Sequence, residues 1–271
     1  MEIEKADDLL TQSGELQSRH LKRTVKLDFY KTDPEASNCS LLLVNDGQDL
    51  VTMDFSKILQ KLNLRPLIVA GIHCGADRKN EYGMITGPDY KGWGAKASSY
   101  EKFIIKELLP FIINQFPGIN FTEKGFAGFS LGGLSALDIS WHHPEIFSMT
   151  AVFSGSLWWR SVDKDDKDYD PWKHRMMHKQ IAESDMRPGM TFFFECGEMD
   201  EMEDRNKNGV IDSIDDTLDL MRILVRKGYR EGKNLSYLQM PEGRHDVPSW
   251  AKALPHFLKW AYSADPSRSL P

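Results

Sequence analysis

The chain has 271 residues and a formal net charge of −6 at pH 7, with acidic and basic residues mixed along it. This length suits one large α/β domain or two small ones, and no stretch has the composition of a linker. We therefore expect a single domain over 1–271, with a core of about 22–262 and an N-terminal arm of 1–21. The mixed, mildly acidic charge argues against a surface for nucleic acid or for anionic membranes.

Two further features of the composition bear on the compartment. The N-terminal residues are polar and no later stretch reaches the ~20 apolar residues of a membrane span. Cys39, Cys74 and Cys196 are odd in number and lack metal-ligand spacing, which is typical of buried free thiols. These features predict a cytoplasmic protein, or a secreted or periplasmic one if a signal peptide has been removed.

Hydrophobic patterning predicts strands that alternate with helices. Residues 1–20 are expected to form a helix or an unordered arm, and a long loop is expected over 72–96. The expected strands are 24–30, 40–44, 66–70, 121–129, 149–153, 190–195 and 235–240, and the expected helices are 98–113, 131–142, 172–184, 214–227 and 248–261. This order predicts an α/β fold with a mostly parallel central sheet and helices on both faces.

One motif joins the strand at 121–129 to the helix at 131–142. Residues 128–132 read Gly-Phe-Ser-Leu-Gly, the G-x-S-x-G pattern of a nucleophile elbow. In such an elbow the serine, here Ser130, is exposed on a strained turn, and the N–H of Leu131 faces a developing oxyanion. The alternative is an ordinary Gly/Ser-rich turn, because the bare pattern also arises by chance.

A serine nucleophile needs an imidazole base and a carboxylate that orients it. His245 lies in a loop between the last strand and the last helix, which brings it to the sheet edge where the elbow opens. The preceding strand-to-helix loop offers Asp200 as the acid, with Glu198 as the second candidate. Ser130, Asp200 and His245 follow the chain order Ser…acid…His of α/β-hydrolases.

With these residues in place, the sequence from about 25 to 262 resembles the putative-esterase family of α/β-hydrolases. This family includes esterase D, enterochelin esterases, and feruloyl and acetylxylan esterases. The resemblance rests on the elbow with its second glycine Gly133, on Phe-Ser-Gly-Ser-x-Trp at 153–158, on Cys-Gly-x-x-Asp at 196–200, and on Gly-x-His-Asp at 243–246 followed by Trp250. It implies the same triad, and it implies that the N–H of Gln48 is a second oxyanion donor, although the usual His-Gly pair is missing there.

Aromatic residues are expected to shape the substrate pocket. Tyr82, Tyr90 and Trp93 lie in the long loop, and Trp158 and Trp159 follow a strand. Two adjacent tryptophans cannot both point into one core, so at least one, Trp158, is expected to line the cleft. A tryptophan pair packed under a helix is the alternative.

The segment after Asp200 fits the spacing of a twelve-residue calcium loop. It has a glycine at position 6, and its candidate ligands are Asp204, Asn206, Asn208, Asp212 and Asp215. A structural calcium ion and a simple Asn/Asp/Gly turn that caps a helix are the two interpretations.

The sequence thus predicts a serine carboxylesterase that hydrolyses a small or carbohydrate-linked ester through an acyl-serine intermediate, with no cofactor for catalysis. An acyltransferase that uses the same triad is the first alternative, since the fold supports both reactions. A non-catalytic binding domain of the same fold is the second.

Overall fold

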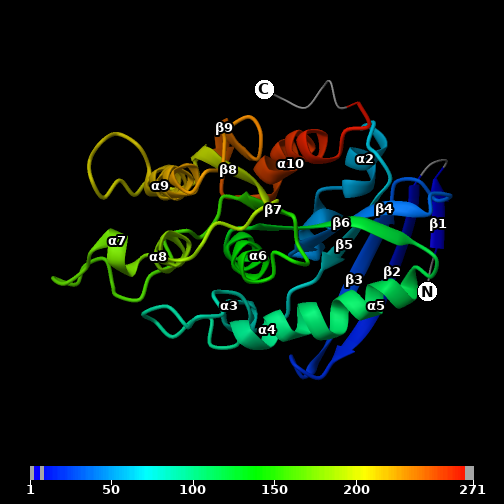
Figure 1. Cartoon of the computed structure of the whole chain (residues 1–271), viewed down its shortest axis with the longest axis horizontal. Helices are drawn as coiled ribbons and strands as arrows, with labels where there is room; N and C mark the ends of the chain where they lie inside the picture. The colour runs from blue at the N-terminus through cyan, green and yellow to red at the C-terminus, as the bar shows by residue number, and fades with distance from the viewer. Residues whose placement is uncertain (1–2, 7–8, 266–271) are drawn as a thin grey trace.

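The computed structural model describes residues 3–6 and 9–265, whose strands form one nine-stranded sheet of order β1-β2-β3-β5-β4-β6-β7-β8-β9 (Figure 1). Strands β1 to β3 and β5 pair antiparallel, whereas the pairs from β5 through β4 to β9 are parallel. The bounds are β1 Ile3–Ala6, β2 Leu9–Ser18, β3 Arg23–Lys31, β4 Asn38–Asn45, β5 Leu67–Ile72, β6 Asn120–Phe129, β7 Met149–Phe153, β8 Thr191–Met199 and β9 Leu235–Arg244. The predicted mostly parallel sheet is confirmed.

Helices cover both faces of the sheet, as the continuous apolar runs of the central strands require. In Figure 1, α2 and α10 lie on one side of the sheet, and α4, α5 and α6 lie on the other. The bounds are α1 Gly47–Thr52, α2 Phe55–Gln60, α3 Arg78–Glu81, α4 Ala97–Phe103, α5 Leu109–Gln115, α6 Leu131–His142, α7 Pro171–His174, α8 Met176–Glu183, α9 Asp212–Arg226 and α10 Val247–Tyr262, with a π-helical turn Ile104–Leu108 between α4 and α5.

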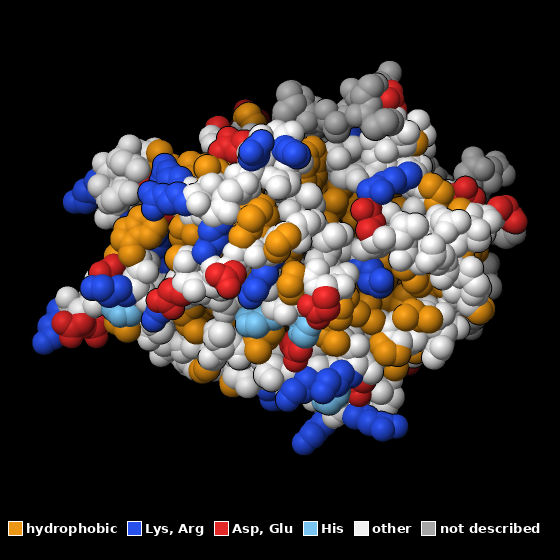
Figure 2. Space-filling view, viewed as in Figure 1, with side chains coloured by type: hydrophobic (Ala, Val, Ile, Leu, Met, Phe, Trp, Pro, Cys, Tyr) orange, Lys and Arg blue, Asp and Glu red, His pale blue; other side chains and the backbone are white. Residues whose placement is uncertain are grey.

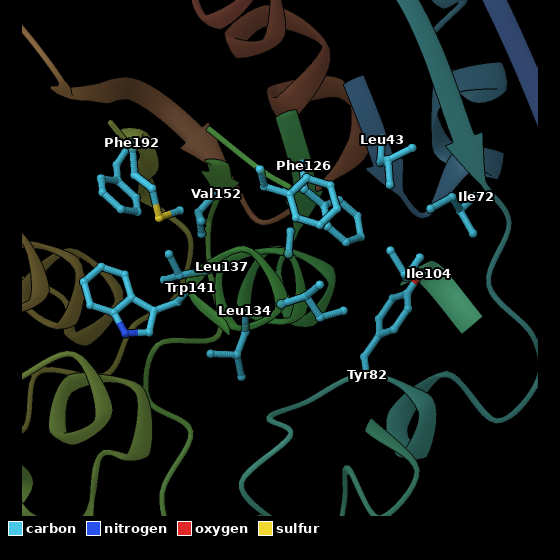
Figure 3. Packing of buried hydrophobic residues seen from close by; sticks show 14 of the residues in the cluster. Leu43, Ile72, Tyr82, Ile104, Phe126, Leu134, Leu137, Trp141, Val152 and Phe192 are labelled. Carbon is cyan, nitrogen blue, oxygen red and sulfur yellow. The ribbon is translucent and has the colours of Figure 1, made fainter. Parts of the chain in front are cut away.

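The core consists of two apolar layers, one on each face of the sheet. The larger layer joins the sheet to α4, α5, α6, α8 and α9, and the smaller one joins it to α1, α2 and α10. Figure 3 shows part of the larger layer, where Trp141 of α6 packs near Phe192 of β8 with ring centroids 6.1 Å apart. Helix α6 is buried along nearly its whole length. The elbow at its first residue is therefore anchored in the interior.

The N-terminal segment differs from the sequence expectation. Instead of a helix or an unordered arm, residues 9–18 form strand β2, which pairs antiparallel with β3 from Leu10↔Lys31 to Ser18↔Arg23. Most β2 side chains are partly or fully exposed, so the strand lacks a continuous apolar run. Its stability comes from the ladder with β3, a pairing that no local pattern announces.

The surface and the cysteines complete the description. Lys and Arg side chains are interspersed with Asp and Glu over the face shown in Figure 2, so this face has no extended field of one sign. All three cysteines are free, with Cys39 and Cys196 buried and Cys74 half-buried. In the described ranges 3–6 and 9–265, no helix combines the length and the apolar character that a membrane crossing requires.

Candidate active site

The predicted elbow is present, with Ser130 between the end of β6 and the start of α6. Ser130 has φ 54° and ψ −122°, a strained conformation that costs of order 1–3 kcal/mol. A Cβ on Gly128 would lie 2.4 Å from the carbonyl carbon and oxygen of Gly132, so only glycine permits this close turn. The N–H of Ser130 donates to the Phe153 carbonyl at 2.8 Å, which ties the elbow to β7. These constraints hold the serine hydroxyl at the carboxyl edge of the sheet.

The loop after β4 lies directly against the elbow. Asn45 is fully buried and its side-chain amide donates to the carbonyl of Gly132 at 2.7 Å. Within the described chain, the N–H groups of Gln48 and Leu131 form no hydrogen bond, as expected in the first turns of α1 and α6. Both residues therefore offer an unpaired N–H, Leu131 on the elbow and Gln48 in the loop after β4, and an oxyanion hole is built from such donors.

Sequence reasoning missed the ion pair that fixes this loop. Arg78 binds Asp46 through two hydrogen bonds, Nε to Oδ1 and Nη2 to Oδ2, both of 2.7 Å. Asp46 is buried and left-handed, with φ 61°, and a Cβ on Gly132 would lie 2.7 Å from its Oδ2. The two residues are 32 apart in the chain, so only the packing of the long loop brings them together.

Strand register brings Asp200 and His245 together. Met199 at the end of β8 pairs with Arg244 at the end of β9, so the next residue of each strand lies at the same edge. The two turns approach so closely that a Cβ on Gly197 would lie 2.4 Å from the backbone of Gly243. The predicted acid and the predicted base therefore follow two neighbouring strand ends.

Rigid contacts also position the histidine. The Asp246 carboxylate accepts the N–H of Ser249 at 2.9 Å and caps α10 immediately after His245. The ring of His245 packs edge-on against Trp250, with centroids 5.3 Å apart. The base is therefore held between a strand end and a helix cap.

No hydrogen bond links Ser130 to His245, or His245 to Asp200, in the described part of the chain. The Ser130 hydroxyl is 3.4 Å from that of Ser156 instead. Oδ2 of Asp200 accepts the N–H of Gly197 at 3.1 Å, whereas its Oδ1 is buried without a partner. Such catalytic contacts often tighten only when substrate binds, and Oδ1 is the free acceptor that an imidazole N–H needs.

The electrostatics suit a general base. Although part of His245 faces solvent, its pKa is lowered, mainly because the surrounding protein removes water from the ring. The charge of Asp200 opposes this shift, and that of Arg78 adds to it. Burial also raises the pKa of Asp200, while the hydroxyl of Ser154 opposes that shift. The imidazole is therefore neutral, and able to accept a proton, at neutral pH.

The second candidate acid lies elsewhere. Glu198 is exposed, and its Oε1 accepts a hydrogen bond of 2.9 Å from Gln239 on β9. The structure thus gives Glu198 a partner away from the histidine and leaves a buried oxygen of Asp200 free. This arrangement favours Asp200.

Three of the predicted pocket aromatics lie together. Tyr90, Trp93 and Trp158 line a cavity of about 370 Å³, together with Lys91, Arg160, Lys164, Glu201, Glu203 and Asp212. The guanidinium of Arg160 lies 5.1 Å from the Tyr90 ring centroid and 5.4 Å from that of Trp158. The lining includes Glu201, which follows Asp200 in the sequence, but it includes none of Ser130, Asp200 and His245.

Tyr82 does not line this cavity, contrary to expectation. Its side chain is fully buried among the core residues shown in Figure 3. There it packs edge-on against Tyr100. Its hydroxyl accepts the N–H of Asp46 at 3.3 Å. Tyr82 therefore contacts the start of the loop after β4 from the core. Trp159 is also fully buried.

The predicted calcium loop closes on itself through hydrogen bonds. The amide groups of Asn206 and Asn208 both donate to Oδ2 of Asp215, at 2.7 and 3.0 Å. The carboxylate of Asp204 accepts the backbone N–H groups of Asn208 and Gly209, at 3.2 and 2.9 Å. Four of the five predicted ligands are thus gathered in one turn.

The fifth predicted ligand has a cation of its own. Oδ1 of Asp212 accepts the backbone N–H of Arg205 at 2.8 Å and lies 3.5 Å from its guanidinium. Among the described residues, no group of three or more His, Cys, Asp or Glu side chains is arranged to hold a metal ion. Asparagine side chains would have to supply part of any ligand set here.

The chain is similar to several solved structures of esterases and hydrolases. A search of curated proteins finds no match. The enterobactin esterase of Shigella flexneri, solved with enterobactin, is similar with a TM-score of 0.68 and 20% identity over 92% of this chain and 57% of that one. This chain therefore spans less than two thirds of that enzyme.

Two other solved structures are similar. An IroE-like serine hydrolase from Shewanella oneidensis has a TM-score of 0.65 and 22% identity, and the match covers 92% of this chain and 80% of that one. A ferulic acid esterase has a TM-score of 0.63 and 16% identity, and the match covers 93% of this chain and 96% of that one. The model of the putative-esterase family matches residues 18–261, from the end of β2 to the last turn of α10. The chain belongs to the putative-esterase family.

Proposed function

We propose that this protein is a serine carboxylesterase that works through an acyl-Ser130 intermediate. One observation supports the proposal most: Met199 and Arg244 pair at the ends of β8 and β9, so Asp200 and His245 follow at the sheet edge where the strained turn holds Ser130. The N–H groups of Leu131 and Gln48, which have no hydrogen-bond partner among the described residues, are the proposed oxyanion donors.

In the proposed reaction, the hydroxyl oxygen of Ser130 attacks the ester carbonyl carbon while His245 takes the hydroxyl proton. The resulting oxyanion accepts hydrogen bonds from the N–H groups of Leu131 and Gln48. His245 then gives the proton to the departing alcohol. A water molecule repeats the sequence on the acyl-enzyme, releasing the acid and restoring the serine. Asp200 stabilises the imidazolium in both halves.

The aromatic cavity, whose lining residue Glu201 follows Asp200 in the sequence, supports an ester with an aromatic group. Tyr90, Trp93 and Trp158 supply ring faces, and burying a ring of this size contributes ~1.5–3 kcal/mol. Lys91 and Arg160 lie over those rings and add positive charge. Two of the similar structures are named as esterases of enterobactin and of ferulic acid, and ferulic acid is itself aromatic.

A substrate panel tests the proposal. Purified protein is assayed with p-nitrophenyl acetate, a feruloyl ester, an acetylated sugar and a catecholate lactone, beside the Ser130→Ala variant as a matched control. We expect turnover that depends on Ser130, with the highest kcat/KM on the feruloyl and catecholate esters. Transfer to an added alcohol in place of water would instead support the acyltransferase, and no turnover of any ester would support a binding domain.

We also propose that the loop at 204–215 takes calcium as a structural ion. Supporting this, Asp204, Asn206, Asn208 and Asp215 are gathered in one turn. At ~100 times its Kd, calcium would stabilise the folded state by about 2.7 kcal/mol. Melting curves in EDTA and in millimolar calcium should therefore separate while kcat stays unchanged. Superimposed curves would show that the loop is only a hydrogen-bonded turn.

We also propose that the protein is located in the cytoplasm. The three free cysteines support a reducing compartment. Fractionation of the source cells followed by immunodetection tests it, and recovery of the protein from the periplasm or medium would contradict it.

A further inference from the structure

Behind the triad lies a carboxyl group that the proposed reaction does not use. Glu195 is 1% exposed, and both of its carboxyl oxygens are buried without a hydrogen-bond partner of good geometry among the described residues. Phe193, two residues earlier on the same face of β8, packs in the apolar layer under α10. A buried carboxyl with no cation beside it is far more stable as the neutral acid than as the carboxylate.

Ser154 connects this acid to the active site. The N–H of Ser154 donates to the backbone carbonyl of Glu195 at 2.8 Å, where β7 ends beside β8. Its hydroxyl lies close enough to interact with the carboxyl groups of both Glu195 and Asp200. The same hydroxyl oxygen accepts the indole N–H of Trp250 at 2.9 Å. Three side chains thus lie around one hydroxyl, and the indole of Trp250 is the one hydrogen-bonded to it among the described residues.

The hydrogen count at this hydroxyl decides the protonation of its neighbours. A serine hydroxyl has one hydrogen to donate and two positions that accept. Trp250 occupies one accepting position. Ionised Asp200 can only accept, so the hydrogen is the one contact that the Ser154 hydroxyl can offer it. The remaining position of Ser154 can be filled only by a donor, and Glu195 is a donor only when it carries a proton.

We propose that Glu195 is a positioning residue of this active site: as a neutral acid it donates to Ser154 and thereby commits the single Ser154 hydrogen to Asp200. If Glu195 releases its proton to solvent, it becomes a second acceptor and competes with Asp200 for that hydrogen. Asp200 then loses a contact that holds it beside His245, and a second negative charge lies next to it. The inference rests on the proposed esterase function.

The surroundings of Glu195 support a proton that is held at neutral pH. Burial, and then the charge of Asp200, raise the pKa of Glu195 to about 8. The charged group that acts on it is Asp200, just past the end of its own strand, while β7 and α10 contribute the uncharged Ser154 and Trp250. On β9 its partner is Leu238, so the titratable Tyr237 and Cys196 lie on the opposite face of the sheet. No cation among the described residues contributes to the shift.

Two variants and a pH profile test the inference. Glu195→Gln keeps a neutral donor that does not titrate, and Glu195→Leu removes the donor at similar size. We expect the wild-type kcat/KM to fall above pH about 8, and we expect this falling limb to vanish in Glu195→Gln. The Leu variant should lose about tenfold in kcat at pH 7 with KM unchanged, and Gln should recover most of that loss. In an Asp200→Asn background the effect of Leu should disappear, because Glu195 acts through Asp200.

An infrared readout makes the test independent of activity. The difference spectrum of wild type minus Glu195→Gln at pH 7 should contain the carbonyl band of a protonated carboxyl, and this band should disappear above pH about 8. Absence of the band at pH 7, or an unchanged falling limb in Glu195→Gln, overturns the inference. If the protein hydrolyses no ester, the proposed function fails while the infrared band still reports the state of Glu195.

Discussion

We predict that replacing Glu195 by glutamine changes the pH dependence of the free energy of unfolding. The pKa of this carboxyl is raised to about 8 in the folded protein, by burial and by Asp200. In the unfolded chain a glutamate titrates near ~4.3. Between these two pH values the folded protein holds a proton that the unfolded chain has released.

The sign of the effect follows from this difference in bound protons. Stability from Glu195 is fully present below the unfolded pKa and is lost as pH rises through the folded pKa, by about 1.4 kcal/mol per pH unit. From pH 5 to pH 7 the wild type should lose about 2.7 kcal/mol through this group alone. The glutamine variant has no such group. Its free energy of unfolding should therefore improve by that amount relative to wild type over the same interval.

Urea denaturation at pH 5, 6, 7 and 8 gives the free energy of unfolding of each protein. The difference between wild type and Glu195→Gln is compared across pH, because the titration of groups that the two proteins share cancels in it. Glu198→Gln is the matched control, because Glu198 is an exposed carboxyl three residues further along the same strand. The free energy of unfolding of Glu198→Gln should differ from that of wild type by the same amount at each of these pH values. If the Glu195→Gln difference is equally flat, the folded protein holds an ionised Glu195 and our account of that residue is wrong.

Three further outcomes test the site. Asp200→Asn should lower kcat by roughly 10³ to 10⁴, because the amide favours the wrong histidine tautomer, and Glu198→Gln should cost much less; the reverse ranking in steady-state assays would move the acid to Glu198. Trp158→Ala should raise KM roughly tenfold to a hundredfold for aryl esters and much less for acetate; equal changes for both would place the ring in the core. Gly128→Ala should lower stability by about 1–3 kcal/mol and abolish turnover, since its Cβ would lie 2.4 Å from Gly132; a variant with wild-type melting and kcat would refute the elbow argument.

Local patterns in the sequence were sufficient for the elbow and the elements around it. The strand at 149–153 and the helix at 131–142 have the predicted bounds, because a buried apolar run and a Gly/Ser turn are local signals. His245 was identifiable because a loop after the last strand must reach the same edge as the elbow.

The features that sequence reasoning missed depend on contacts between distant segments. Strand β2 is largely polar and exists through its ladder with β3. The Arg78–Asp46 pair forms only when the long loop folds back on the end of β4. Tyr82 was expected in the cleft because the sequence does not distinguish a loop aromatic that faces solvent from one that faces the core. Glu195 did have a signal, namely one acidic residue in the otherwise apolar run of β8.

The most direct test of the central claim is to identify the residue that becomes acylated. The protein is mixed with a slowly deacylated p-nitrophenyl ester, quenched in acid within one turnover and digested for peptide mass spectrometry, beside the Ser130→Ala variant. We predict a mass increase equal to one acyl group on the peptide that contains Ser130, and none in the variant. An acyl group on another residue, or hydrolysis by Ser130→Ala at the wild-type rate, would contradict the account.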